Sequence, residues 1–190
     1  LSTVVDALPS TGVTFLFAPA WHPALVNLAP LRRSLGVRTV FNLLGPLVNP
    51  LRPQAQVLGV ARAELLDPMA GALLRLGLDR AVVVHGAGGL DEASLCGANE
   101  LRLIESGQIT ARHIKPDEIG LSEAPLESLR GGDCSINQEI LRAVLQGSGT
   151  SAQTDVVAFN TALVLWAAGI QPDLTSASRT ALAALREGLP

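Results

Sequence analysis

Residues 56–85 read QVLGVARAELLDPMAGALLRLGLDRAVVVH, and this stretch decides the fold. Its two ends, residues 56–60 and 79–85, are short apolar runs of the kind that form buried strands. Between them, residues 63–76 place apolar side chains at helical spacing, with Pro68 as a first-turn residue or a kink. A strand, a helix and a strand with short connections predict a parallel strand pair with a right-handed crossover.

The sequence on both sides extends this pattern. Residues 2–8 are predicted to end a helix, and residues 13–17 to form a short buried strand. Residues 99–114 are typical of a hairpin that turns at Ser106-Gly107. Three further helices are predicted near residues 135–146, 154–168 and 174–187. We therefore expect an α/β fold: a central, mostly parallel sheet flanked by helices, with a helical C-terminal part, in one domain over residues 1–190.

Composition excludes several classes of protein. The 190 residues suit one domain with a real core, and 48% of them are apolar. Aromatic residues make up only 3%, the formal net charge is −3, and Lys115 is the one lysine. Neither a base-stacking surface nor a basic stripe is present, so nucleic-acid binding is not expected.

The cysteines and the lengths of the apolar runs indicate the cellular compartment. Cys96 and Cys134 have no metal-ligand spacing and suggest free thiols in a reducing compartment. No apolar run is long enough to span a membrane, and the first residues do not resemble a signal peptide. We expect a cytoplasmic protein without membrane contact.

An unusual loop follows the strand predicted at residues 79–85, where residues 85–92 read HGAGGLDE. The adjacent carboxylates of Asp91 and Glu92 repel each other unless they are solvated at a loop tip or joined by a cation. Mg²⁺ prefers such oxygen ligands, and α/β proteins bind ligands at the carboxyl ends of parallel strands. From these residues alone, both a solvated loop and a magnesium site remain open. His85 is expected to pack at the strand end.

Other segments allow two interpretations as well. Residues 18–23, APAWHP, open a predicted helix, where His22 either donates to an anion or simply caps the turn. Arg32-Arg33, near the end of that helix, suits the helix dipole or clamps an anion. Residues 41–50 end in a rigid Gly-Pro and Asn-Pro bend. Asp133, after two glycines, is read as a helix N-cap rather than part of a phosphate loop.

Taken together, three stretches resemble the anthranilate phosphoribosyltransferases, within the nucleoside phosphorylase/phosphoribosyltransferase family. They are residues 15–50, residues 82–94 and residues 129–169. Within them, LGPLVNP at 44–50 and HGAGGLDE at 85–92 are the most specific in this order and spacing. The resemblance runs essentially from end to end.

The resemblance implies transfer of a phosphoribosyl group from phosphoribosyl pyrophosphate to anthranilate in tryptophan biosynthesis, by a magnesium-dependent homodimer. It implies that Asp91 and Glu92 hold Mg²⁺, that Arg32 contacts the anthranilate carboxylate, and that His22 lines the anthranilate channel. No residue is assigned to covalent catalysis. The residues that fall in segments lining or shaping the site are Pro19, Asn42, Gly45 and Pro46.

The resemblance also implies what this chain lacks. The family's N-terminal helical domain, its Gly-Thr-Gly-Gly-Asp loop that grips pyrophosphate and its Lys-His-Gly-Asn segment have no counterpart here. We therefore expect a fragment, truncated on its N-terminal side and inactive alone. Two alternatives remain. One is a pyrimidine nucleoside phosphorylase-like enzyme, and Arg32-Arg33 and LGPLVNP argue against it. The other is a non-catalytic nucleic-acid-binding relative, and the net charge of −3 argues against it.

Overall fold

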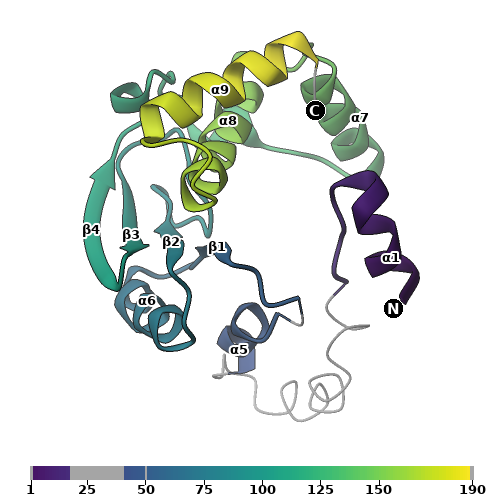
Figure 1. Cartoon of the computed structure of the whole chain (residues 1–190). Coiled ribbons are helices and arrows are strands. Elements are labelled where there is room, and N and C mark those ends of the chain that lie inside the picture. Colours follow the sequence, from purple (N-terminus) through teal and green to yellow (C-terminus); the bar gives the residue numbers. More distant parts are fainter. Residues whose placement is uncertain (1, 18–40, 50, 189–190) are drawn as a thin grey trace, which may run out of the picture. The chain divides into compact units, whose positions relative to one another are not determined.

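The computed structural model describes residues 2–17, 41–49 and 51–188 (Figure 1). Contacts divide the chain into two compact units, residues 1–53 and 54–190. The prediction of one domain over the whole chain stays a prediction.

The described part of the first unit consists of two helices and an irregular segment. The helices are α1 (Ser2–Thr11) and α5 (Phe41–Leu47). The helix predicted at residues 2–8 is thus confirmed, whereas residues 13–17 form neither a helix nor a strand. The prediction of a buried strand there is wrong, because Val13 and Phe15 are exposed and the described sheet does not include this segment. Apolar composition makes a strand only where a neighbouring strand pairs with it.

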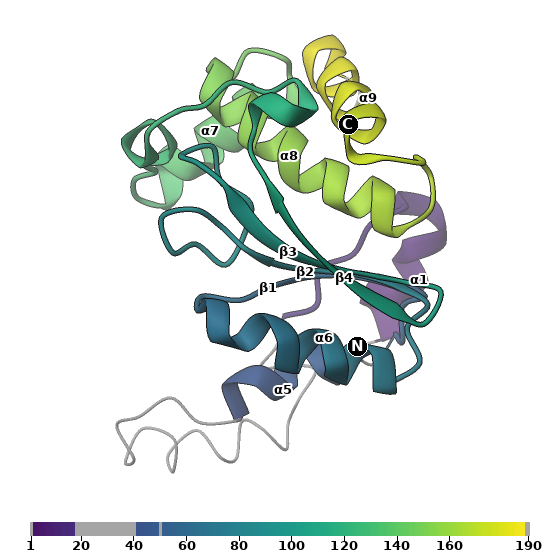
Figure 2. The same ribbon diagram turned by 90° about the vertical axis from the view of Figure 1, so that its left-hand side faces the viewer.

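The second unit is a four-stranded sheet with helices on both faces (Figure 2). The strands, in spatial order, are β1 (Ala55–Gly59), β2 (Arg80–His85), β3 (Asn99–Glu105) and β4 (Gln108–Ile114). A 3₁₀ turn (Ala63–Leu65) and α6 (Leu66–Arg75) connect the first two strands. Pro68 lies in the first turn of α6, where proline costs no hydrogen bond.

The sheet is mixed, which corrects the prediction of a mostly parallel one. β1 and β2 are parallel, as the strand–helix–strand stretch predicted. The β2–β3 and β3–β4 pairs are antiparallel. The predicted hairpin supplies both of the last strands, and short loops can join only antiparallel neighbours. Its turn is at Ser106 and Gly107, with φ of 51° and 78°, as the two-residue hairpin requires.

Three helices form the C-terminal part, as predicted: α7 (Cys134–Leu145), α8 (Ser151–Ala167) and α9 (Leu174–Glu187). Asp133 is the N-cap of α7, since its Oδ1 accepts from the Ile136 amide at 3.0 Å. α6 covers one face of the sheet and α8, with α9 packed on it, covers the other (Figure 2). The core between sheet and helices includes Val82, Phe159 and Leu163. Within the described residues, no helix has the length and apolarity to cross a membrane.

Candidate metal site at the end of β2

The candidate site is the loop that leaves the carboxyl end of β2 and returns at β3. Its first residues form a tight turn, in which the Gly86 amide donates to the Leu90 carbonyl at 2.8 Å. Gly88 and Gly89 have φ of 83° and 84°, a left-handed conformation that glycine adopts without strain. This glycine-rich turn therefore directs the chain back so that Asp91 and Glu92 follow it.

Two glycines, one in β1 and one at the start of this turn, let the backbone of the carboxylate pair pack closely. A Cβ at Gly59, in β1, would lie 1.5 Å from the Asp91 carbonyl oxygen. A Cβ at Gly86 would lie 1.9 Å from the Glu92 carbonyl oxygen. Real Cβ atoms do not approach backbone so closely, so any larger residue at either position has to move the loop. Glycine here is required for space.

A fully buried amide holds the loop from the protein interior. Asn99 Oδ1 accepts from the Ser94 amide at 2.7 Å and the Ala87 amide at 3.2 Å. Its Nδ2 donates to the carbonyls of Ser94, Gly97 and Ile114 at 3.0–3.2 Å. Buried polar groups that are satisfied in this way make a backbone conformation unique.

A second amide reaches the loop from α8. Asn160 Oδ1 accepts from the Ala93 amide at 2.9 Å, and its Nδ2 donates to the Ala93 carbonyl, also at 2.9 Å. His85, at the start of the loop, has its Nδ1 atom 2.8 Å from the Val60 carbonyl oxygen. His85 therefore packs at the strand end, as predicted.

The carboxylates themselves face solvent. Asp91 and Glu92 are both exposed, and within residues 2–17, 41–49 and 51–188 neither takes part in an ion pair. The described residues include no cluster of three or more metal-ligating side chains. This donor set fits Mg²⁺, which uses one or two carboxylates and completes its shell with water and substrate phosphates. Asp91 and Glu92 could hold the ion.

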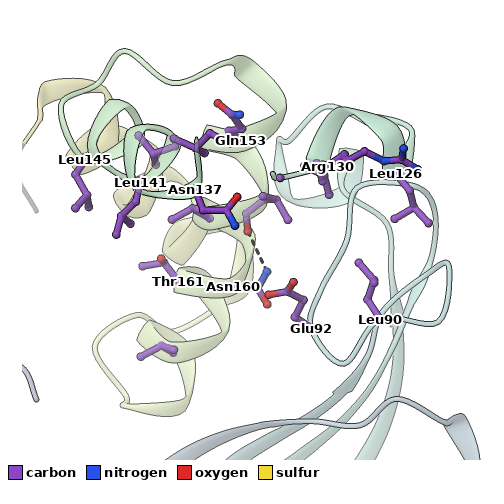
Figure 3. Close-up of a pocket in the computed structure, with 17 residues that line it drawn as sticks. Leu90, Glu92, Leu126, Arg130, Asn137, Leu141, Leu145, Gln153, Asn160 and Thr161 are labelled. Atoms are coloured by element: carbon purple, nitrogen blue, oxygen red, sulfur yellow. Dashed lines mark hydrogen bonds between the residues drawn. The ribbon is translucent and has the colours of Figure 1, made fainter. Parts of the chain in front are cut away.

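An open cavity of about 750 Å³ adjoins the loop, between α7 and α8 (Figure 3). Its lining is mainly aliphatic, and Glu92 and Arg130 are its charged members. Asn137 and Asn160 line it from α7 and α8, respectively. The loop carboxylate therefore borders a largely apolar space rather than a polar pocket.

The structure locates only some of the residues predicted for the site. Asp91 and Glu92 lie together at the end of β2, whereas His22, Arg32 and Pro19 lie outside the described residues. The other predicted segment residues, Asn42, Gly45 and Pro46, belong to α5. The roles predicted for all of them stay predictions.

Sequence reasoning missed the residues that hold the loop. Gly59 reads as an ordinary strand residue, and Asn99 as the first residue of a hairpin. Asn160 offered one signal, because it is a lone amide within the apolar run VVAFNTALVL at residues 156–165. A half-buried polar residue within a core-facing helix usually has a specific partner.

Comparison with known protein families gives the class of protein to which this mixed α/β unit, with its carboxylate pair after a parallel strand, belongs. The chain belongs to the family described as "Glycosyl transferase family, a/b domain", which matches residues 2–189.

Within that family, this chain is similar to anthranilate phosphoribosyltransferases. It is 74% identical over 191 residues to the one from Synechococcus sp. (strain CC9902), covering 100% of this chain and 54% of that protein. The crystal structure of the Thermus thermophilus enzyme superposes with a TM-score of 0.91 at 44% identity, covering 98% and 55% of the two chains. The Saccharomyces cerevisiae enzyme in complex with PRPP and Mg has a TM-score of 0.86 at 28% identity, covering 99% and 54%. The chain thus spans about half the length of the relatives it matches.

Proposed function

We propose that this chain is the α/β portion of an anthranilate phosphoribosyltransferase. The reaction moves the phosphoribosyl group of 5-phosphoribosyl 1-pyrophosphate to the amine of anthranilate and releases pyrophosphate, in tryptophan biosynthesis. The observation that carries this proposal is 74% identity to the Synechococcus enzyme along the whole chain. The exposed carboxylate pair at the end of β2 supports it.

In this proposal Asp91 and Glu92 hold Mg²⁺ against the pyrophosphate. When bound, the ion neutralises charge that develops on the leaving group. The close packing of the loop backbone on Gly59 and Gly86 keeps both carboxylates at the strand end. Their exposure leaves room for phosphate oxygens and water in the remaining coordination positions.

Arg32 and His22 are proposed to bind the second substrate. A guanidinium at Arg32 would pair with the anthranilate carboxylate through charge-assisted hydrogen bonds and set the distance of the amine from the ribose. His22 would form part of the channel wall. The aromatic amine is weakly basic, so positioning contributes more than a strong base, and no covalent intermediate is needed.

The oligomeric state and the cellular location of the protein are also proposed from its similarity to anthranilate phosphoribosyltransferases. We propose a homodimer of the complete enzyme in the cytoplasm, with no nucleic-acid or membrane partner. The net charge of −3 and the single lysine support the absence of a nucleic-acid surface.

The test joins this chain to the part of the Synechococcus sp. (strain CC9902) relative that lies outside the matched stretch. Purified chimera is incubated with both substrates, and magnesium-dependent loss of anthranilate fluorescence is followed. We expect turnover by the chimera and none by the 190-residue chain alone. A chimera that folds but forms no product would contradict the proposed activity.

The metal assignment is tested in the same chimera with the double substitution Asp91→Asn and Glu92→Gln. Turnover should fall by about 10²–10³-fold, which is the usual effect of removing one group that stabilises charge in the transition state. Tm should stay almost unchanged. Asp117→Asn with Glu118→Gln, another adjacent acidic pair, is the matched control and should keep near-normal turnover. Near-normal rates of the first variant across a magnesium titration would show the assignment to be wrong.

A further inference from the structure

The side chain of Asn160 makes three hydrogen bonds to two backbone segments. Oδ1 accepts from the Ala93 amide, and Nδ2 donates to the Ala93 carbonyl and, at 3.0 Å, to the Val156 carbonyl. An amide has two N–H donors, and both are engaged. Asn160 therefore bridges α8 and the carboxylate loop through bonds that no aliphatic side chain could make.

The bonded group is the peptide unit that links Glu92 to Ala93. Its N–H belongs to Ala93 and donates to Asn160. Its carbonyl belongs to Glu92 and is the oxygen that lies against Gly86, where a Cβ would approach to 1.9 Å. One peptide plane is thus held on both sides, from α8 and from the end of β2. Fixing this plane fixes the backbone from which the Glu92 side chain leaves.

The neighbouring peptide, which links Ala93 to Ser94, is held by two side chains, because its carbonyl accepts from Asn160 Nδ2 and its N–H donates to Asn99. The Ser94 amide donates to Asn99 at 2.7 Å, and Ala93 and Ser94 are completely buried, whereas Glu92 is exposed. Asn99 thus anchors the buried half of the loop, and Asn160 acts at the point where the chain emerges. Asparagine is also a poorer helix former than alanine or leucine, so its place inside α8 is not explained by helix stability.

We infer that Asn160 is a positioning residue for the metal site: by holding the Glu92–Ala93 peptide it keeps the Glu92 carboxylate beside that of Asp91. This inference rests on the proposed function, in which the two carboxylates share one divalent cation. Asn160 itself does not contact the ion, and its effect is exerted through the loop backbone.

The experiment uses the isotope-labelled 190-residue chain and NMR spectroscopy. Hydrogen exchange is measured at the Ala93 and Ser94 amides, and Mn²⁺, a paramagnetic substitute for Mg²⁺, is titrated while signals of residues 89–93 are followed. The variants are Asn160→Leu, close in volume, and Asn160→Ala. Asn137→Leu is the matched control, because Asn137 lines the same cavity but makes its two-bond clamp, at 2.9 and 3.0 Å, on Gly132, which is not part of the loop.

In Asn160→Leu, exchange at Ala93 should accelerate by at least about tenfold, and the Mn²⁺ dissociation constant should rise by about tenfold, as expected for a lost buried hydrogen bond. Protection at Ser94 should remain within about threefold, because its amide keeps its own hydrogen bond to Asn99 and local opening does not unfold the rest. Asn137→Leu should change neither quantity. If Asn160→Leu does not fold, Asn160→Ala provides the same comparison.

The outcomes separate this inference from the function on which it rests. Unchanged Mn²⁺ affinity in a folded Asn160 variant, with the unsubstituted chain binding Mn²⁺ at residues 89–93, overturns the positioning role alone. Absence of broadening in the unsubstituted chain overturns the metal assignment of Asp91 and Glu92, and the inference with it. Equal loss of protection at Ala93 and Ser94 would make Asn160 a general structural residue and also overturn the inference.

Discussion

The main-chain carbonyl of Asp91 lies against Gly59, so closely that a Cβ at position 59 would come within 1.5 Å of the oxygen. β1 therefore does more than pair with β2. It provides the surface on which the first carboxylate of the candidate metal site is placed, and only a residue without a side chain leaves enough space.

Gly59→Ala should consequently displace the loop. We expect a loss of about 1–3 kcal/mol in the free energy of unfolding, typical of overpacking against backbone, and loss of Mn²⁺ broadening at residues 89–93. Thermal denaturation and the NMR titration measure both. Gly71→Ala is the control, because its nearest neighbour is the flexible end of Arg75 at 3.5 Å. That helical substitution should be neutral or stabilising by up to about 1 kcal/mol. A Gly59→Ala protein with unchanged Mn²⁺ binding would argue against the packing account.

Arg32 is predicted to act on one substrate only. Replacing it with alanine in the chimera should raise KM for anthranilate by about tenfold or more, since a charged hydrogen bond contributes on the order of 1.5–3 kcal/mol. KM for phosphoribosyl pyrophosphate should stay nearly constant. Steady-state kinetics with each substrate varied in turn provide the comparison, and Arg33→Ala is the adjacent control. Equal effects on both substrates would make Arg32 a structural residue rather than a ligand of anthranilate.

Arg80 is predicted to stabilise the C-terminal end of α8. Its Nη2 donates to the Trp166 carbonyl at 2.7 Å, its Nε donates to the Ala167 carbonyl at 3.2 Å, and its guanidinium lies 4.5 Å from the centre of the Trp166 ring. The last carbonyls of a helix lack their usual partner four residues on. The Trp166 carbonyl also accepts from the Gly169 amide at 3.0 Å, so Arg80 adds a second donor there and supplies a donor to the Ala167 carbonyl.

Arg80→Ala should therefore cost about 1–3 kcal/mol in urea unfolding. Arg80→Lys should recover less than half of this loss, because lysine cannot donate to both carbonyls in one plane. Arg112→Ala, at an exposed position of β4, should stay within about 0.5 kcal/mol of the unsubstituted chain. Full recovery by lysine would indicate that charge alone matters at position 80.

Asp173 should make stability depend on pH. The Ser176 amide donates to this N-cap carboxylate at 2.7 Å, and that bond holds the pKa of Asp173 below its ordinary value. A carboxyl group whose pKa is lowered in the folded state stabilises the fold at pH values above its unfolded-state pKa of about 3.9. This stabilisation is lost as pH falls through the folded-state pKa.

Asp173→Asn keeps an N-cap acceptor but removes the charge. We expect the variant to be less stable than the unsubstituted chain at pH 6, with the difference shrinking as pH falls below about 4. Thermal unfolding between pH 2.5 and 6 measures this. Asp79→Asn, at an exposed position before β2, is the control for removing one negative charge from the chain. A difference that stays constant with pH would exclude titration of Asp173 as its cause.

Local sequence determined much of the second unit. The alternation and length of apolar runs predicted β1, α6 and β2 and their parallel pairing. The Ser106-Gly107 pair made the hairpin predictable, and the positive φ of both residues confirms the turn. Asp133 was predictable as an N-cap. The turn and the cap depend on groups a few residues apart, and the β1–β2 pairing on one short helical connection between consecutive elements.

Tertiary structure alone decided the rest. Contacts between distant segments determine three features that the sequence did not show. They are the mixed parallel and antiparallel pairing of the sheet, the irregular conformation of residues 13–17, and the packing of the Asp91 backbone against Gly59. The bonds from Asn160 to Ala93 join positions far apart in the chain. The physical reason is that close backbone approach and amide clamps depend on distances between segments, and residue type and periodicity carry no information about those distances until the chain is folded.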